Sequence, residues 1–258
     1  MIKLDHFVVH VDNDMNALNN LKAKIVPLGF PFEPKWGKGT KGFKATNIWI
    51  GEQYFEIVWL KRKDGGGWRS DWVEKYTGGH RGIIAIGLLT DELDRTVKEL
   101  KERGIPVSDP ERISFRWFFG LLKKSMPWRN AFPPSIPGTD LQIFFGELDS
   151  PQVMDKMKAY MVPNSSENGI TGIQEALVKT KFSEEAWKYL HTLFPKAAEQ
   201  GSRLVYDMGT TKLSFETNNS PDMVVELKAI TTDPSHEGHC FTVGNVHVQT
   251  EPARIEGE

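Results

Sequence analysis

The sequence predicts an α+β protein of repeated βαβββ modules, which form curved mixed sheets with helices outside them. The first observation behind this prediction is the order of strand, helix and strands, which occurs three times along the chain. The second is its spacing of about 80 to 90 residues, which indicates an internal repeat outside the solenoid periods. The third is the composition, 39% hydrophobic and 26% charged, which is typical of globular proteins and argues against disorder.

The first round begins with a β-rich segment from Ile2 to Val11. Short polar residues, Asp12 to Asp14, then provide a helix N-cap, and Met15 to Val26 has the apolar spacing of a helix. Two strands are predicted at Ala45 to Ile50 and at Tyr54 to Leu60, with a turn between them.

The second and third rounds repeat this order. A Pro-rich loop separates the last two strands of the second round, and Ser183 caps the helix of the third. The predicted elements of the second round are a strand at Gly82–Leu89, a helix at Glu92–Arg103, and strands at Ile113–Phe119 and Leu141–Phe145. Those of the third are a strand at Gly172–Val178, a helix at Ser183–Leu193, and strands at Arg203–Tyr206, Lys212–Glu216 and Met223–Ile230.

The rounds divide the chain into two predicted units. Residues 1–149 would hold two paired modules, and residues 150–258 a third related module with a C-terminal strand. The segment from Ser150 to Asn168, with its prolines, is the expected junction. An unpaired third module would cover the open sheet of the first two or pair with its copy, so a homodimer is one expectation.

Bulk charge and cysteine usage limit the partners and the compartment. The net charge of −2 gives no attraction to polyanions, so we expect neither nucleic acid nor a membrane as partner. Cys240 is the single cysteine, which excludes an internal disulfide and fits a reducing compartment. The N-terminus reaches polar residues at once, unlike a signal peptide. The expected location is the cytoplasm.

Two chemically versatile residues lie on the first and last strands of the first module. His6 and Glu56 would converge on a pocket, since these strands lie side by side in such a module. An imidazole and a carboxylate can share a divalent metal, or act without metal as general acid and base. A histidine in an apolar strand is also commonly a hydrogen-bonded core residue. His10 shares the face of His6 by alternation.

At this point the chain resembles a known family. The segments Leu4–Val9, Thr46–Ile50 and Tyr54–Val58 resemble the glyoxalase-like domain of the vicinal oxygen chelate superfamily. The second module, with Gly82–Ile86 and Thr90–Asp94, is similar to the family's second half, so the resemblance covers roughly residues 2 to 148. It implies paired modules in a barrel-like sheet, with a divalent metal held by one residue from each of four strands.

The resemblance assigns metal positions to this chain. His6 matches the first ligand and Glu56 the second, which is also the candidate catalytic residue. The third position falls near Ile84, which cannot bind a metal, and the fourth at Gln142 or Phe144, of which only Gln142 could be a ligand. Members of this superfamily that have lost some of these metal ligands resemble binding proteins rather than enzymes.

Other residues are candidates for the pocket wall or for further sites. The expected substrate-binding residues are Trp36, Asn47, Trp49, Arg116 and Trp117, of which Arg116 could clamp a carboxylate or phosphate. Glu226 is matched to the place of Glu56 in the third module. His236, His239 and Cys240 have the residue types of a metal site, without a completing ligand.

Three functions are consistent with a protein that has a pocket for a small molecule. The first is a metal-dependent lyase, isomerase or dioxygenase-like enzyme using His6, Glu56 and Gln142. The second is a metal-free protein that binds or sequesters a small molecule between tryptophans, without catalysis. The third is a structural dimer whose pocket is vestigial. The sequence leaves the choice among them, the metal and the substrate open.

Overall fold

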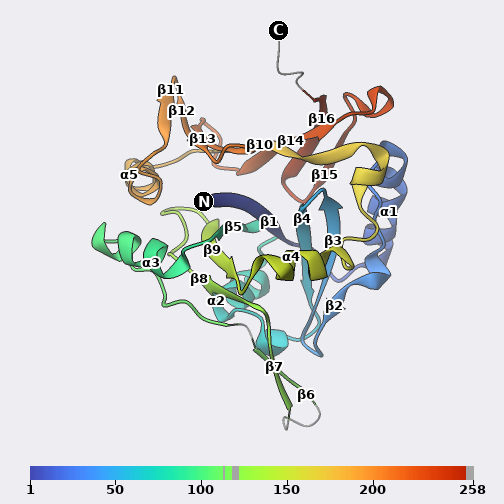
Figure 1. The fold of residues 1–258 in the computed structure, drawn as a ribbon, viewed down its shortest axis with the longest axis horizontal. Helices are drawn as coiled ribbons and strands as arrows, with labels where there is room; N and C mark the ends of the chain where they lie inside the picture. Colours follow the sequence, from blue (N-terminus) through green and yellow to red (C-terminus); the bar gives the residue numbers. More distant parts are fainter. Residues whose placement is uncertain (113, 118–121, 254–258) are drawn as a thin grey trace.

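The computed structural model of the chain describes residues 1–253, apart from residue 113 and residues 118–121. These residues form two seven-stranded mixed sheets, helices around them, and a separate two-stranded hairpin (Figure 1). The predicted α+β class with βαβββ modules is confirmed.

The first sheet contains both modules of the N-terminal half in the order β2-β3-β4-β1-β5-β9-β8. Each module brings its first and last strands together in parallel, β1 beside β4 and β5 beside β9. The two modules join where β1 and β5 pair antiparallel. The strands are β1 (Ile2–His10), β2 (Lys38–Gly39), β3 (Phe43–Ile50), β4 (Gln53–Leu60), β5 (Gly82–Thr90), β8 (Trp128–Ala131) and β9 (Gln142–Leu148).

The second sheet has the same arrangement strand by strand, in the order β11-β12-β13-β10-β14-β16-β15. β10 is parallel to β13 and antiparallel to β14, and β14 is parallel to β16. The strands are β10 (Ile170–Thr180), β11 (Ala198–Gln200), β12 (Arg203–Asp207), β13 (Lys212–Thr217), β14 (Val224–Thr231), β15 (Cys240–Val243) and β16 (Val246–Pro252).

This order corrects the match of Glu226 to Glu56. Glu226 lies on β14, which holds the place of β5, whereas the counterpart of β4 is β13. The sequence pattern was misleading because β13 and β14 are both apolar strands, and only pairing shows which one lies parallel to β10. Since β10 pairs with β14 of its own chain, an unpaired module no longer gives a reason to expect a dimer.

The helices lie outside the strands. Asp14 caps α1 by accepting hydrogen bonds from the N–H groups of Asn16 and Ala17, and Ser183 caps α5 through Ala186. The sequence patterns did not predict α2 or α4; α4 lies in the expected junction. The helices are α1 (Met15–Ile25), α2 (Ser70–Thr77), α3 (Leu93–Glu102), α4 (Pro151–Lys158) and α5 (Glu184–Leu193). The hairpin strands are β6 (Ser114–Trp117) and β7 (Leu122–Ser125).

Short 3-10 turns complete the fold, at η1 (Val26–Leu28), η2 (Pro34–Trp36), η3 (Gly65–Gly67), η4 (Ser165–Asn168) and η5 (Pro234–His236). The glycine-rich loop before Arg69 forms η3, and the Trp68 ring that follows packs 4.7 Å from the ring of Phe43. None of the helices formed by the described residues has the length and apolar character needed to cross a membrane.

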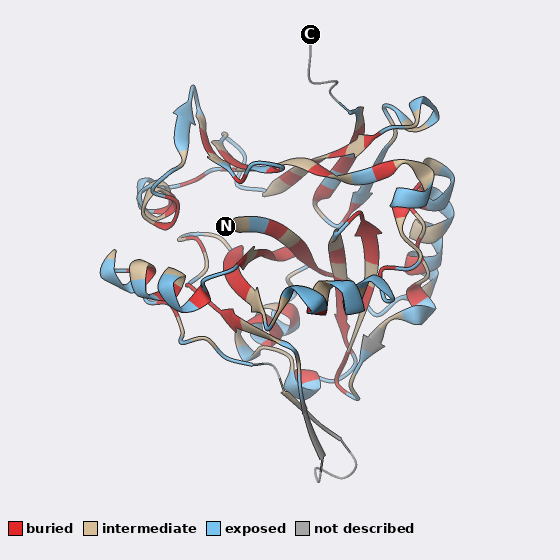
Figure 2. Cartoon of the chain, viewed as in Figure 1, coloured by how far each residue is buried: buried red, intermediate tan, exposed pale blue. Residues whose placement is uncertain are grey.

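The two sheets pack through their inner faces, and their buried side chains form one hydrophobic cluster. Phe30, beyond α1, meets Phe241 of β15 with ring centroids 4.7 Å apart. Gln53 of β4 accepts a hydrogen bond from the Ile173 N–H at 2.8 Å. Figure 2 shows the strands of the first sheet mostly buried, while the helices expose much of their surface. We call the opposite faces of the two sheets their outer faces.

Candidate functional site

The outer face of the first sheet carries the candidate residues. On β1, alternation directs His6, Val8 and His10 to this face. His6 lies opposite Tyr54 of β4, and Glu56 lies opposite Asn47 of β3. The sequence-predicted residues His6, Asn47 and Glu56 therefore share one face of three neighbouring strands.

A β-bulge adds Asp5 to this group. Leu4 pairs with Leu88 and His6 with Gly87, which leaves Asp5 without a partner on β5. Consecutive strand residues normally point to opposite faces, but a bulge redirects one of them. As a result the Asp5 Oδ2 accepts a hydrogen bond from His6 Nδ1 at 2.7 Å. The sequence analysis missed Asp5 because strict alternation places it on the other face.

The second ring nitrogen of His6 faces Glu56. His6 Nε2 lies 4.0 Å from Glu56 Oε2, and the Glu56 side chain is 25% exposed. Burial lowers the pKa of His6, but the hydrogen bond and charge of Asp5 and the charge of Glu56 together raise this pKa above 6.5. Burial also raises the pKa of Glu56, aided by Asp5 and opposed by His6. The two carboxylates therefore favour the protonated form of the His6 ring.

A row of rings crosses the sheet at the level of His6. The Tyr54 ring stacks on His6 with centroids 4.6 Å apart and an interplanar angle of 10°. The Trp49 ring lies 4.2 Å from Tyr54, and Phe144 of β9 meets His6 edge-on at 5.4 Å. Gly87 makes this possible, because a Cβ there would lie 2.8 Å from Phe144 and 2.9 Å from His6. The sequence analysis named Trp49 but missed Tyr54, although Tyr54 alternates with Glu56.

The second half of the sheet closes against α2. Gln142 is buried; its Oε1 accepts a hydrogen bond from Trp72 Nε1 at 2.9 Å, and its Nε2 donates to the Pro133 carbonyl at 2.7 Å. Both ends of this amide are therefore engaged. Ile84, the expected third position, lies fully buried in a bulge between Ala85 and Ile83.

These donors do not fit a resident divalent metal. The 4.0 Å between His6 Nε2 and Glu56 Oε2 would suit a shared ion, and a carboxylate behind the histidine is common in metal sites. However, the position opposite His6 is Gly87, and the Gln142 oxygen is bound to Trp72. Nowhere in the described part of the chain do three His, Cys, Asp or Glu side chains gather as a metal would require.

Several other predicted residues lie apart from this group. Trp36 is 64% exposed in η2 and makes none of the ring contacts that join Trp49 to the site. Arg116 and Trp117 are in β6, but their side chains lie outside the described part of the structure. His10 is fully buried, and burial and the neighbouring His80 lower its pKa to about 3, so His10 stays neutral.

The late histidines form no metal group with Cys240. The rings of His236 and His239 lie 5.5 Å apart, and Cys240 is exposed. The His236 ring instead fits against Gly29, where an added Cβ would lie 3.0 Å from it. The structure therefore uses His236 in packing between the two halves of the chain.

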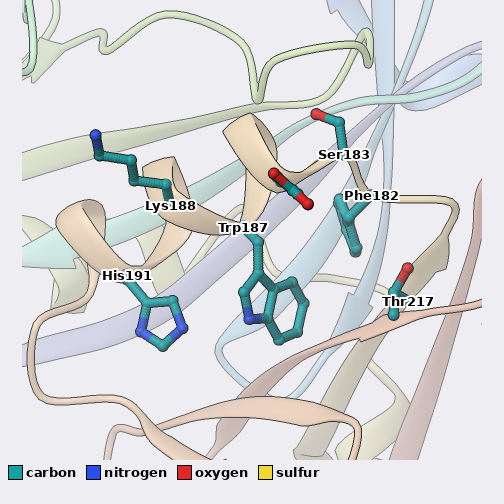
Figure 3. A pocket seen from close by; sticks show the side chains of 7 residues that line it. Phe182, Ser183, Trp187, Lys188, His191 and Thr217 are labelled. Atoms are coloured by element: carbon teal, nitrogen blue, oxygen red, sulfur yellow. The ribbon is translucent and has the colours of Figure 1, made fainter.

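Two hollows lie away from His6. One of about 520 Å³ is lined at the start of α5 by Phe182, Trp187, His191 and neighbours. Figure 3 shows the Phe182 and Trp187 rings directed toward Thr217, with Lys188 pointing away. A second hollow of about 330 Å³ lies between the sheets near Arg81 and Asn245. The hollow on α5 is larger, but its His191 is paired with Glu199 outside it, so we place the chemistry at His6 and Glu56.

The outer face of the second sheet has different residues at equivalent places. A bulge at Gln174 precedes Glu175, as the bulge at Asp5 precedes His6. Counting from these bulges, Glu175 takes the place of His6 and Ser214 that of Glu56. Lys228, at the place of Gly87, lies 3.4 Å from Glu175 and 3.3 Å from Glu251. This face is joined by ion pairs and offers no paired imidazole and carboxylate at those positions.

Comparisons with known proteins agree with the fold. The family model described as "Glyoxalase-like domain" matches residues 4–194. A search of curated proteins gives no match. A hypothetical protein from Staphylococcus aureus superimposes with a TM-score of 0.71 at 13% identity, covering 98% of this chain and 100% of the other. That likeness covers both sheets and concerns the fold alone.

Methylmalonyl-CoA epimerases align with a smaller part of the chain. A variant of the Streptomyces coelicolor enzyme, in complex with 2-nitronate-propionyl-CoA, has a TM-score of 0.40 at 15% identity and covers 57% of this chain and 95% of its own. The Mycobacterium tuberculosis enzyme has a TM-score of 0.41 at 13% identity, covering 59% and 91%.

Proposed function

Since the chain belongs to the family of glyoxalase-like domains, we propose that its first outer face binds a small carbonyl compound and moves a proton at the carbon beside the carbonyl. The arrangement of Asp5, His6 and Glu56 supports this proposal. Asp5 accepts a hydrogen bond from His6 Nδ1, and Glu56 Oε2 lies 4.0 Å from His6 Nε2. Such pairs act as general acid and base when both reach the substrate.

The two groups take different roles. Glu56 is withdrawn from water, which raises its pKa and makes the carboxylate a stronger base. It takes the proton from carbon, and the electron pair of the C–H bond moves into the carbonyl to give an enolate. Protonated His6 donates a hydrogen bond from Nε2 to the enolate oxygen, while Asp5 holds Nδ1 and stabilises the imidazolium. Delivery of a proton to a neighbouring carbon completes an isomerisation, and delivery to the opposite face of the same carbon completes an epimerisation.

No step of this proposal uses a metal, because the donor set provides two ligands where bound metals take three or more. A metal-free binding protein remains the second candidate. The partly exposed Tyr54 ring beside His6 favours it, because it can give a ligand apolar contact.

Proton exchange separates the two candidates. Acetone, butanone and dihydroxyacetone are incubated with the full chain in D₂O, and loss of the protons beside the carbonyl is followed by NMR. The proposal expects exchange above the buffer rate that persists in EDTA and is lost in Glu56→Gln. Binding without exchange for every ketone would favour the binding protein, and loss of exchange in EDTA would show that a metal is required.

A further inference from the structure

The cations of this chain are unevenly distributed. The whole chain carries a net charge of −2, but residues 34–51 contain four lysines and no Asp or Glu, and residues 61–63 are Lys-Arg-Lys. Salt limits electrostatic attraction to a distance of about 8 Å at physiological ionic strength, so a partner responds to the charge of the surface it meets. The net charge therefore does not describe how this part of the molecule meets an anionic partner.

Hydrogen bonds bring the two cationic segments together, where β3 begins and β4 ends. The Lys61 N–H donates to the Gly42 carbonyl, and the Lys61 Nζ donates to the Thr40 carbonyl at 2.8 Å. The Lys44 Nζ donates to the Lys35 carbonyl at 3.4 Å. All the side chains of this group are exposed except that of Lys44, which is half-buried. We call the group the basic surface: Lys35, Trp36, Lys41, Lys44, Lys61, Arg62 and Lys63.

The protein provides few carboxylates to neutralise the basic surface. Within the described part of the chain, Arg62 is the one cation of this surface that forms an ion pair, with Asp64. The carboxylate of Glu33, close to Lys35 in sequence, is paired with Lys22. The lysines of the basic surface therefore present an uncompensated positive charge to solvent.

An aromatic ring lies among these lysines. Trp36 is 64% exposed, whereas every other tryptophan whose side chain is described is buried or half-buried. Indole rings favour the interface between water and a membrane, where the apolar ring leaves water and the N–H group stays hydrated. Lysines beside such a ring are attracted to anionic lipid headgroups. The two features together fit the surface of an anionic membrane.

The same residues favour a lipid surface over a nucleic acid. Single-stranded nucleic acid stacks successive bases on several aromatic rings, but Trp36 is the one ring of the basic surface. Five of the six cations are lysines, which act as point charges, whereas arginine holds an individual phosphate with a planar pair of donors. Point charges suit the diffuse negative charge of many headgroups.

We propose that the basic surface attaches the chain to membranes that contain anionic phospholipids. Trp36 enters the interface between headgroups and acyl chains, and the lysines face the lipid phosphates. The side chains of Asp5, His6 and Glu56 are not part of the basic surface. Attachment is therefore independent of the proposed proton transfer.

Sedimentation of the full chain with lipid vesicles tests the attachment. One set of vesicles contains phosphatidylglycerol and phosphatidylcholine in equal parts, and the other contains phosphatidylcholine alone. We expect the chain to bind the first set roughly 100-fold more strongly than the second at low salt. This preference should decrease as salt is added, because salt screens the attraction.

Variants of the basic surface identify the residues that bind. Lys35→Gln combined with Lys41→Gln should weaken binding about fivefold for each lysine removed. Trp36→Ala should also weaken it and remove most of the quenching of tryptophan fluorescence by brominated phosphatidylcholine in the first set. Lys98→Gln with Lys188→Gln is the matched control. It removes two exposed lysines from α3 and α5, across the molecule from β2 (Figure 1), and should bind like the wild type.

Equal binding to the two sets of vesicles, no binding to the first set at low salt, or an equal loss in the control variant would overturn the inference. Tighter binding of a single-stranded oligonucleotide than of the vesicles, or self-association that Trp36→Ala abolishes, would also overturn it and assign the surface to another partner. Circular dichroism confirms folding of each variant; if one fails to fold, the preference of the wild type between the vesicles decides.

Discussion

The two outer faces of this chain have the same strand topology but differ in how their charged residues are paired. In the first, the bulge in β1 joins Asp5 to His6, and Gly87 leaves room for the rings of His6 and Phe144. In the second, the equivalent bulge precedes Glu175, and Lys228 occupies the place of Gly87 and binds two carboxylates. On the first face, Asp5 and Glu56 pair with His6 and with no lysine or arginine among the described residues. On the second face, the glutamates pair with lysine and arginine.

The comparison teaches that pairing position, rather than residue type, distinguishes the face to which we assign chemistry from the face joined by ion pairs. Both faces carry glutamates at the surface of a curved sheet. Burial raises the pKa of Glu56, even though the neighbouring His6 acts to lower it. Glu216 instead pairs with Arg203 and Glu226 with Lys179.

The largest expected effect comes from removing the proposed base. Glu56→Gln should lower the rate of proton exchange by roughly 10²- to 10⁴-fold, while binding persists, because the amide keeps the shape of the side chain. Glu216→Gln makes the same change on the second face and should leave exchange unaffected. Equal losses in both variants would mean that the faces are not functionally different.

The second effect concerns the space above β5. Gly87→Ala places a methyl group within 3 Å of Phe144 and His6, and overpacking of this kind destabilises a protein by about 1–3 kcal/mol. Urea unfolding of the variant measures this loss. Gly172→Ala is the control, since its Cβ would meet only the end of the Gln53 side chain, at 3.3 Å. A fully stable Gly87→Ala would show that the rings are not closely packed over β5.

Much of this arrangement could be predicted from the sequence. Alternation and capping residues place β1, α1, β3 and β4 within a few residues of their observed ends, and bring His6 and Glu56 to one face of the sheet. Alternation could not place Asp5, because a bulge is set by pairing with a distant strand. The hydrogen bond between Trp72 and Gln142 could not be predicted from the sequence either. The helix α2 has no strong apolar repeat, and its Trp72 lies 70 residues away from Gln142 in sequence.

The third effect is on the dependence of exchange on pH. The rate should rise with pH through the pKa of Glu56, above 4.5, and fall through the pKa of His6, above 6.5. Without the Asp5 charge, burial dominates and lowers the pKa of His6. Asp5→Asn should therefore move the alkaline limb to lower pH. If the alkaline limb lies at the same pH in Asp5→Asn as in the wild type, Asp5 does not influence the proton transfer.

The smallest effect is expected on the second face. Lys228 is 43% exposed, so solvent screens its two ion pairs, and Lys228→Met should cost only about 0.5–1 kcal/mol. Thermal unfolding at low and high salt checks this, with the difference from wild type shrinking as salt rises. Proton exchange should be unchanged; a large loss of exchange would mean that the second face communicates with the first.

The central claim is that Asp5, His6 and Glu56 act as one electrostatic unit, and an NMR titration of the His6 ring tests it most directly. The account predicts a pKa above 6.5 in the wild type, because two carboxylates outweigh burial. It also predicts a lower pKa in both Asp5→Asn and Glu56→Gln, with the larger drop in Asp5→Asn. A His6 pKa below 6.5 in the wild type, or one that neither variant changes, would contradict the account.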